Sequence, residues 1–572
     1  MVLMCRILIY TSFSNGKLTL FDSCFCSSLI SNPSVAEKKH IDLILTITML
    51  QLEFLVSPLL FIIPFAFFFF YFFIRKTKIS SPATTKLPTA YPFVGHIFAA
   101  PKNRDLLMPW IAEILQNSPN ATFTVKRFNR QNIITANPAN VQHILKTQFY
   151  KYPKGPFFRN NLHDLLGSGI FNADGDQWKF ERQISSPEFN TKSLRKFVGT
   201  VVEAELSQCL LPLLSTATAE NSVLDLQDIL QRFAFDNICK IAFGFDPKSL
   251  SPTFPQQEAE FAVAFDEAVK LITGRFPTMI QAVWKVKRAL NLGSEKQLGL
   301  AVSHVRQFAR RIVREKRREL EEKSSLETRD LLSRILNSGH LDEDLVTDMV
   351  ISFILAGRDT TSAALTWFFW LVSRNYQVEE EIVKEIREMK DTMDYDDVKD
   401  MVYTHASLCE SMRLYPPVPG DTKEAAGDDV LPDGTVVKKG MRVTYHPYTM
   451  GRLESLWGKD WAEFRPERWL EREESSGKWR FVPRDPYTYT VFQAGPRICL
   501  GKEMAFLQMQ RIVAGVMRRY RVVPAEKGFE PVFVSYLTSK MKGGFPARIE
   551  ERERVRCEPV TGESGFTMCP IR

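Results

Sequence analysis

The pattern of hydrophobic and polar positions separates an apolar N-terminal segment from a long amphipathic body. Residues 54–74 (FLVSPLLFIIPFAFFFFYFFI) carry no charge, and as a helix they would cross a hydrocarbon core of roughly 30 Å. Further on, apolar positions recur at helical spacing at 195–245, 257–293, 295–323 and 342–391. Strand-like alternation is clearest at 430–446, around an Asp433-Gly434 turn. The pattern predicts a mainly α fold with small β-sheets (α+β) and an N-terminal transmembrane helix.

Charges on either side of the apolar segment predict its orientation. Arg75, Lys76 and Lys78 follow it directly, whereas Asp42 and Glu53 precede it, so the positive-inside rule places the body in the cytosol. We expect a retained anchor at 54–74, a basic, proline-rich hinge at 75–95, one large domain at 96–554 and a C-terminal tail at 555–572. Residues 1–48 show no periodicity, and Met49 could itself begin a protein. We therefore interpret 1–48 as a disordered gene-model extension.

Composition excludes several classes of function. The net charge of +8 is spread along the chain rather than gathered in a basic stripe, so we expect no nucleic-acid partner. The 9 cysteines form no paired CxxC sets, which argues against a zinc ribbon or a disulfide scaffold. Most of them should be small buried residues or free thiols.

One cysteine, Cys499, has an informative setting. It lies in Phe492-Gln-Ala-Gly495-Pro-Arg497-Ile-Cys499-Leu-Gly501, directly before a helical segment. A helix N-terminus stabilises a thiolate through its dipole and its free N–H groups. We interpret Gly495 and Gly501 as positions where the backbone can pass close beneath a flat cofactor. A lone cysteine is usually a buried apolar residue, but here several features coincide around the same one.

This loop resembles the haem-binding loop of the cytochrome P-450 family, FxxGxRxCxG, at every fixed position. The resemblance implies haem b as cofactor, with Cys499 as the metal ligand and Phe492, Gly495, Arg497 and Gly501 around it. Thiolate ligation would push electron density onto the iron. The same resemblance assigns haem propionates to Arg497, to Trp178 and Arg182 of a WxxxR segment, and to Lys423.

Polar residues interrupt an apolar helix at Ala356-Gly-Arg-Asp359-Thr360-Thr-Ser. Buried hydroxyls and carboxylates are costly unless they are paired, so a merely structural role fits poorly. The segment resembles the family's AGxDTT motif. This implies that the helix opens a groove for dioxygen and that Asp359 and Thr360 are catalytic, relaying protons through water.

Two further motifs predict a structural network. Glu410 and Arg413 share one face of a helix at i, i+3, which if exposed would be an ion pair of little value. Together with Arg468 of Phe464-Arg-Pro-Glu-Arg468-Trp they resemble the family's buried Glu–Arg–Arg network. We expect this network to hold the fold behind the haem rather than to tune turnover.

The resemblance covers about 87–554 and is finest to plant fatty-acid ω-hydroxylases, at 314–330, 351–370 and 491–506. It implies NADPH- and dioxygen-dependent hydroxylation of a medium- or long-chain fatty acid near its methyl end. No GxGxxG follows a strand, so the electrons should come from a separate NADPH–cytochrome P-450 reductase at the endoplasmic reticulum membrane. We expect a single-pass protein with its catalytic domain in the cytosol, and candidate basic contacts for the reductase at Lys179, Lys192, Arg195, Lys196, Lys502 and Arg511.

The expected substrate pocket is long and apolar, and Gly420 should widen it. Its candidate wall residues are Phe353, Ala356, Val418, Pro419, Tyr536 and Leu537. Three alternatives stay open: hydroxylation of a jasmonoyl-amino acid conjugate, rearrangement of a fatty acid hydroperoxide without dioxygen or reductase, and a non-enzymatic haem-thiolate sensor.

Overall fold

The computed structural model describes residues 103–553 except 128–129, 190–191, 252–253, 278–280, 323–329, 338, 340–341, 391–394 and 476, together with residues 13–14, 17–18, 64, 67, 87–88, 90, 95–96, 99 and 101. The chain divides into two units, Met1–Lys78 and Ile79–Arg572. In the first, β1 (Phe13–Ser14) pairs antiparallel with β2 (Lys17–Leu18). The predicted anchor lies outside the described residues apart from Pro64 and Phe67, which are helical, and the predicted tail lies outside them entirely.

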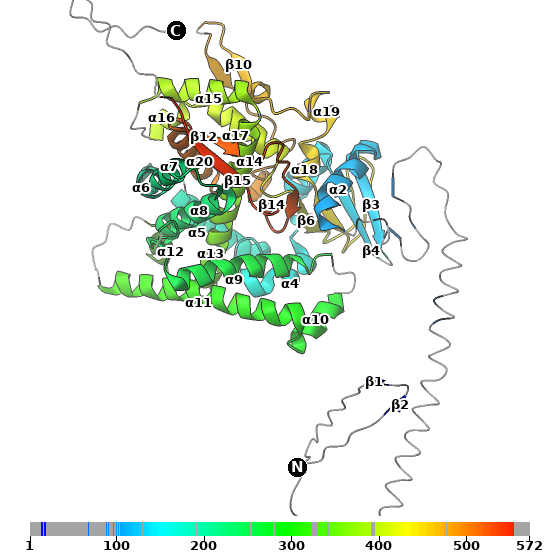
Figure 1. Ribbon diagram of the computed structural model, residues 1–572. Helices are drawn as coiled ribbons and strands as arrows, with labels where there is room; N and C mark the ends of the chain where they lie inside the picture. Colours follow the sequence, from blue (N-terminus) through cyan, green and yellow to red (C-terminus); the bar gives the residue numbers. More distant parts are fainter. Residues whose placement is uncertain are drawn as a thin grey trace, which may run out of the picture. The chain divides into compact units, whose positions relative to one another are not determined.

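Helices dominate the second unit, as the periodicity predicts (Figure 1). They are α2 (Leu107–Gln116), α3 (Pro138–Gln142), α4 (Gly155–Leu166), α5 (Gly175–Phe189), α6 (Lys192–Glu205), α7 (Leu211–Ala219), α8 (Leu226–Phe243), α9 (Gln256–Thr273), α10 (Gln281–Ala289), α11 (Gly293–Glu322), α12 (Leu331–Asn337), α13 (Glu343–Ile354), α14 (Thr360–Ser373), α15 (Tyr376–Glu388), α16 (Tyr395–Lys399), α17 (Val402–Leu414), α18 (Pro447–Met450), α19 (Glu454–Trp457) and α20 (Lys502–Met517).

The predicted run 195–245 is several elements rather than one helix. It breaks before α8, where the Asp225 side chain accepts hydrogen bonds from the N–H groups of Gln227 and Asp228. An aspartate that caps the first free N–H groups of a helix fixes where that helix begins. The break also supplies β5 (Leu224–Asp225), which pairs with β15 (Pro546–Glu551).

Strands form small sheets, so the predicted α+β class is confirmed. The largest has the order β3 (Thr122–Arg127), β4 (Arg130–Thr135), β9 (Arg442–Tyr445), β6 (Asp421–Glu424), with only the β4–β9 pair parallel. A second has the order β12 (Tyr520–Pro524), β15, β5. The hairpins are β7–β8 (Asp429–Val430, Val436–Val437), β10–β11 (Leu470–Arg472, Trp479–Phe481) and β13–β14 (Phe533–Ser535, Ser539–Met541). The expected turn between β7 and β8 is present, with Gly434 at φ +87°.

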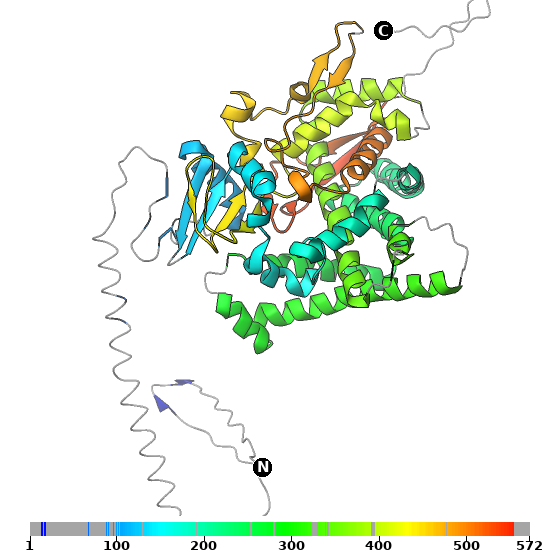
Figure 2. The same cartoon turned by 180° about the vertical axis from the view of Figure 1, so that it is seen from behind.

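The core centres on α14, whose positions from Thr361 to Val372 are all buried. A helix that is apolar on every face must lie inside a domain. Figures 1 and 2 show α14 within the helical part and α11 along its outer edge. The sheet that contains β3 and β4 lies at one side of this unit.

One described stretch, Lys192–Ala219, is long and apolar enough to cross a membrane by length and composition. Its residues Leu194, Val198 and Val202 belong to the same hydrophobic core as α14. Its apolar face is therefore accounted for by packing within the domain.

Candidate active site

The loop that carries Cys499 is fixed by backbone contacts on both sides. The Cys499 N–H donates to the Phe492 carbonyl at 2.8 Å, and Gly501 stands immediately before α20. Gly495 has φ +67°, and a Cβ there would lie 2.1 Å from the Leu145 carbonyl oxygen. Gly495 is therefore needed for a close approach to the segment His143–Thr147, a contact that the sequence did not indicate. At Gly501 a Cβ would meet only Phe189, 4.0 Å away.

The surroundings of Cys499 act on its thiol in opposite directions, and desolvation is the larger effect, so the pKa of the thiol is raised. Desolvation raises the pKa of its thiol, while an N–H bond from Gly501 and the charges of Arg182 and Lys502 lower it. The side chain is nevertheless exposed, unlike those of Cys239 and Cys409, which are buried as expected for small core residues. An exposed sulfur in desolvating surroundings at a helix N-terminus is suited to bind a metal ion.

Arg497 and Trp178 lie together. The guanidinium of Arg497 is 4.6 Å from the centre of the Trp178 ring, and Trp178 lies on α5, as does Arg182. Arg497 also donates to the Asp174 carboxylate at 2.9 Å and to the Ala173 carbonyl at 2.8 Å. Desolvation lowers the pKa of Arg497, and Asp174 acts against it. Asp174 was not anticipated from the sequence, because it belongs to no motif.

Lys423 lies in a second polar cluster centred on Asp421. The carboxylate of Asp421 accepts from Lys154 Nζ at 2.7 Å, from Lys423 Nζ at 2.9 Å, from the Tyr445 hydroxyl at 2.9 Å and from Gln493 Nε2 at 2.7 Å. Burial lowers the pKa of Lys423 to about 7, against the attraction of Asp421. Burial alone would raise the pKa of Asp421, but Lys154 and Lys423 hold it well below its usual range.

These groups fit a haem. A cysteine residue just before a helix N-terminus would supply the iron ligand, and basic side chains on three elements would supply partners for two propionates. Arg182 acts electrostatically on Cys499, and Arg497 acts on Lys423. Among the residues that the model describes, no cluster of three or more His, Cys, Asp and Glu could hold a metal instead.

The Ala356–Thr360 segment has an altered helix. Between α13 and α14, residues Leu355–Asp359 form a π-helix, whose turn is wider than that of an α-helix. In this buried stretch Ala356, Gly357 and Thr360 are half-buried, and the Thr360 hydroxyl donates to the Ala356 carbonyl at 2.5 Å. A Cβ at Gly357 would lie 2.5 Å from the Ile238 side chain, so this glycine permits the contact with α8.

Asp359 is held by residues that the sequence did not indicate. Its Oδ1 accepts from Arg358 at 3.1 Å and weakly from Gln231 at 3.4 Å, while Oδ2 has no partner among the described residues. Arg358 also pairs at 2.8 Å with Asp266 of α9, and Lys540 of β14 lies 3.3 Å from the same carboxylate. Burial raises the pKa of Asp359, with Arg358 and Lys540 acting against it. A carboxyl group of this kind can hold and release a proton.

Most of the residues proposed for the pocket wall are only partly buried. Val418, Tyr536 and Leu537 are half-buried like Ala356, and Pro419 is buried. Phe353 is 7% exposed and packs against Phe189, with ring centres 6.0 Å apart.

Gly420 lies against the His446 side chain. A Cβ at this position would lie 3.3 Å from His446, so the imidazole takes the room that the missing side chain leaves. That Gly420 widens the substrate pocket stays a prediction.

The Glu410 network forms as predicted and is fully enclosed. Two hydrogen bonds of 2.7 Å join Arg413 to Glu410, and both side chains are 0% exposed. Arg468 Nε donates to Glu410 at 3.1 Å, and Trp469 Nε1 donates to it at 3.0 Å. Because both side chains are buried, the pair of Glu410 and Arg413 is not the weak exposed ion pair considered from the sequence.

The basic residues expected to face a reductase do not share one setting. Lys179, Lys192, Lys196 and Lys502 are exposed and Arg195 is half-buried. Arg511 is only 6% exposed, because α20 turns it toward Glu203 of α6, 3.5 Å away. The prediction that Arg511 contacts the reductase is therefore wrong.

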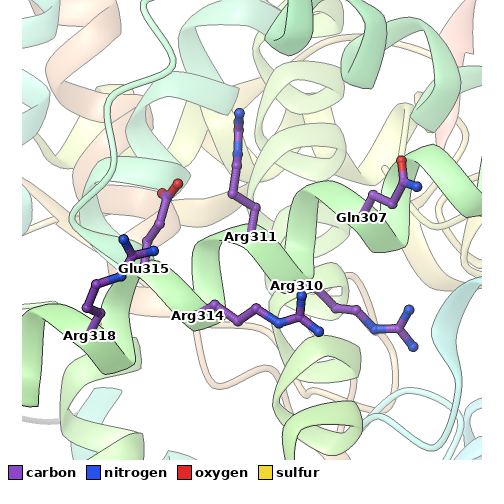
Figure 3. Close-up of a pocket in the computed structure, with 6 residues that line it drawn as sticks. All are labelled: Gln307, Arg310, Arg311, Arg314, Glu315 and Arg318. Carbon is purple, nitrogen blue, oxygen red and sulfur yellow. The ribbon is translucent and has the colours of Figure 1, made fainter.

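A separate basic hollow of about 330 Å³ lies on α11 (Figure 3). Its arginines hold α11 to neighbouring helices: Arg310 pairs with Asp344, Arg311 with Glu258 and Arg314 with Glu343. It has no part in the site around Cys499.

Comparisons with known proteins agree with this geometry. A family model described as Cytochrome P450 matches residues 85–541. The chain is similar to Cytochrome P450 94A1 of Vicia sativa, with 59% identity over 469 residues, 82% of this chain and 91% of that protein. It is 58% identical over 514 residues to Cytochrome P450 94A2 of the same species, covering 88% of this chain and 99% of that protein. Cytochrome P450 94B3 of Arabidopsis thaliana is 48% identical over 509 residues, with the same coverages.

Proposed function

Because this chain belongs to the cytochrome P450 family of haem monooxygenases, in its plant 94 branch, we propose that it hydroxylates medium- or long-chain fatty acids at or near the methyl end. The observation that carries the chemistry is the exposed Cys499 sulfur, set at the N-terminus of α20 beside Arg182. Haem held by a cysteine thiolate supplies the activation of dioxygen when it is bound.

Other residues around this site would bind the haem propionates and favour the thiolate. Arg182, Arg497 and Lys423 would hold the propionates, with Asp174 and Asp421 orienting two of these bases. The Cys499 sulfur accepts the Gly501 N–H bond, which favours its thiolate form.

Asp359 and Thr360 would handle protons. The Thr360 hydroxyl hydrogen is directed at the Ala356 carbonyl, so its oxygen can accept a hydrogen bond from water. The free Oδ2 of Asp359 can pass a proton to the same water. Replacing Thr360 by Ala should therefore preserve the carbon monoxide difference spectrum and increase NADPH consumption that yields no product.

The fatty acid assignment is supported by the apolar character of Ala356, Val418, Leu537 and their neighbours and by the resemblance to ω-hydroxylases. The proposal places the protein as a single-pass protein of the endoplasmic reticulum membrane, where a separate NADPH–cytochrome P450 reductase delivers electrons. The four exposed lysines named above are the contacts we propose for it.

Reconstitution tests the proposal. The purified full chain with a plant NADPH–cytochrome P450 reductase is supplied with labelled fatty acids of increasing length, and mass spectrometry locates the hydroxyl group. We expect oxygen at the terminal or adjacent carbon, dependent on NADPH. Turnover of jasmonoyl-isoleucine but of no fatty acid would show that the substrate is a jasmonoyl-amino acid conjugate instead. Turnover of a fatty acid hydroperoxide without NADPH would show that the reaction is a rearrangement rather than a hydroxylation. Haem binding without any product would indicate a sensor.

A further inference from the structure

A large hollow of about 1290 Å³ lies between the end of α14, helices α15 and α17, and the segment 461–479. None of the residues discussed around Cys499 lines it. Ligand pockets for small molecules occupy roughly 300–1,000 Å³, so a whole organic molecule fits here. Its lining combines aromatic rings with one deep guanidinium, that of Arg452.

Arg452 is a buried cation without an acidic partner. Its side chain is 9% exposed, and its charged end stacks 3.7 Å from the Tyr448 ring and 5.1 Å from the Tyr415 ring. It donates to the Tyr448 carbonyl at 3.2 Å, and no carboxylate of the described residues pairs with it. Desolvation lowers the pKa of Arg452, and the nearby charge of Arg413 lowers it further. Burial of an unpaired charge is costly, whereas a bound anion would offset that cost.

Acidic residues also line this hollow, and Glu380, Glu381, Glu463 and Glu530 are exposed at its rim. Glu467 accepts from the Tyr403 hydroxyl at 2.6 Å, and Glu530 pairs with Arg374. Among the charged residues that line the hollow, Arg452 is the buried one, whereas the other arginines and most of the glutamates are exposed.

The walls near Arg452 suit an apolar or aromatic body. Trp370 and Phe464 are 7% and 8% exposed, and Leu414 completes this side. Tyr415 is held rigidly, since its ring stacks on Trp367 with centres 4.0 Å apart.

We propose that this hollow binds a carboxylate carried on an apolar or aromatic body, with Arg452 pairing with the carboxylate and the rings of Tyr415 and Trp370 against the body. A guanidinium offers two parallel N–H donors that match the two oxygens of a carboxylate. The site is independent of the reaction at Cys499 and does not rest on the substrate assigned above.

Isothermal titration calorimetry with naphthalene-2-carboxylate tests the proposal. The holoenzyme is first saturated with 1-dodecylimidazole, which occupies the haem pocket through its azole nitrogen. We expect one remaining site for the carboxylate, with naphthalene-2-carboxamide binding about tenfold more weakly because it lacks the charge. Arg452→Gln should weaken the carboxylate about tenfold and remove the difference between the two probes.

Two further variants make the outcome decisive even if Arg452→Gln does not fold. Ala462→Trp places a large ring at an exposed position of the same hollow and should weaken the carboxylate about tenfold. Arg465→Gln removes an exposed rim charge that is paired with Asp460, and it should leave the affinity within about twofold. Equal binding of both probes, no effect of Ala462→Trp, or a loss in Arg465→Gln as large as in Arg452→Gln would each overturn the proposal.

Discussion

Replacing Glu410 by Gln removes the carboxylate that pairs with both Arg413 and Arg468, two buried guanidinium groups. In the native structure Glu410 takes two 2.7 Å bonds from Arg413, one of 3.1 Å from Arg468 and one of 3.0 Å from Trp469, with no exposure to solvent. An exposed ion pair would contribute about 0–1 kcal/mol. Removing one partner of a buried pair instead costs about 3–5 kcal/mol, because the remaining charge is left uncompensated. The change should consume a large share of a typical stability of about 5–15 kcal/mol.

The measurement is urea unfolding of the haem-loaded protein, followed by far-ultraviolet circular dichroism and by the carbon monoxide difference spectrum. The matched control is Glu471→Gln, which removes the same charge from an exposed pair with Arg480 at 2.7 Å. We expect a loss of about 3–5 kcal/mol with poor haem retention for Glu410→Gln, and about 0–1 kcal/mol for Glu471→Gln. Losses of equal size in both variants would show that burial of the network has no energetic consequence.

Three further predictions concern other parts of the fold. Cys499→Ala should abolish the carbon monoxide difference spectrum, whereas Cys409→Ala, at a buried thiol, should keep it. If the band survived in Cys499→Ala, Cys499 would not be the iron ligand. Gly495→Ala should lower the free energy of unfolding by about 3 kcal/mol, because it combines a positive φ with a Cβ 2.1 Å from the Leu145 carbonyl oxygen. Gly528→Ala is the control, at φ +82° with nothing within 4 Å of the added Cβ, and it should lower that free energy only by the backbone strain of about 1–2 kcal/mol. Burial raises the pKa of Glu181 from 4.5 to about 7, so the folded state binds its proton more tightly and stability falls as pH rises through this window. Glu181→Gln should therefore gain about 3 kcal/mol over the native protein at pH about 8 and little at pH about 4, in denaturant titrations at both values; an equal gain at both would contradict the assigned cause.

Local patterns predicted the features that depend on neighbours in sequence. The helical repeat at 342–391 gave the buried helix α14, and the i, i+3 spacing of Glu410 and Arg413 placed them on one face. The cysteine loop could be identified because its residues lie within ten positions of one another. These are short-range relations, and a single segment of chain carries them.

Partners that come from distant segments were missed. Lys154 and Asp421 are 267 positions apart, and Asp266 reaches Arg358 from another helix across 92 positions. Nothing in the spacing of either pair signals the contact. The contact between Gly420 and the His446 side chain was missed as well, because His446 follows β9 whereas Gly420 precedes β6.

The amino-acid sequence by itself determined the mainly helical class and the members of the Glu410 network, and it predicted Cys499 as the thiolate ligand and Asp359 with Thr360 as the catalytic pair. The helical class follows from periodicity, whereas the site residues and the inclusion of Arg468 follow from motifs that resemble those of the cytochrome P-450 family. Only the tertiary structure decided which charges Asp421 and Asp359 meet, why Gly495 is a glycine, and that Arg452 is buried without an acid. Such properties depend on the distance between segments and on how much water remains around a group, and both arise only when the chain has packed.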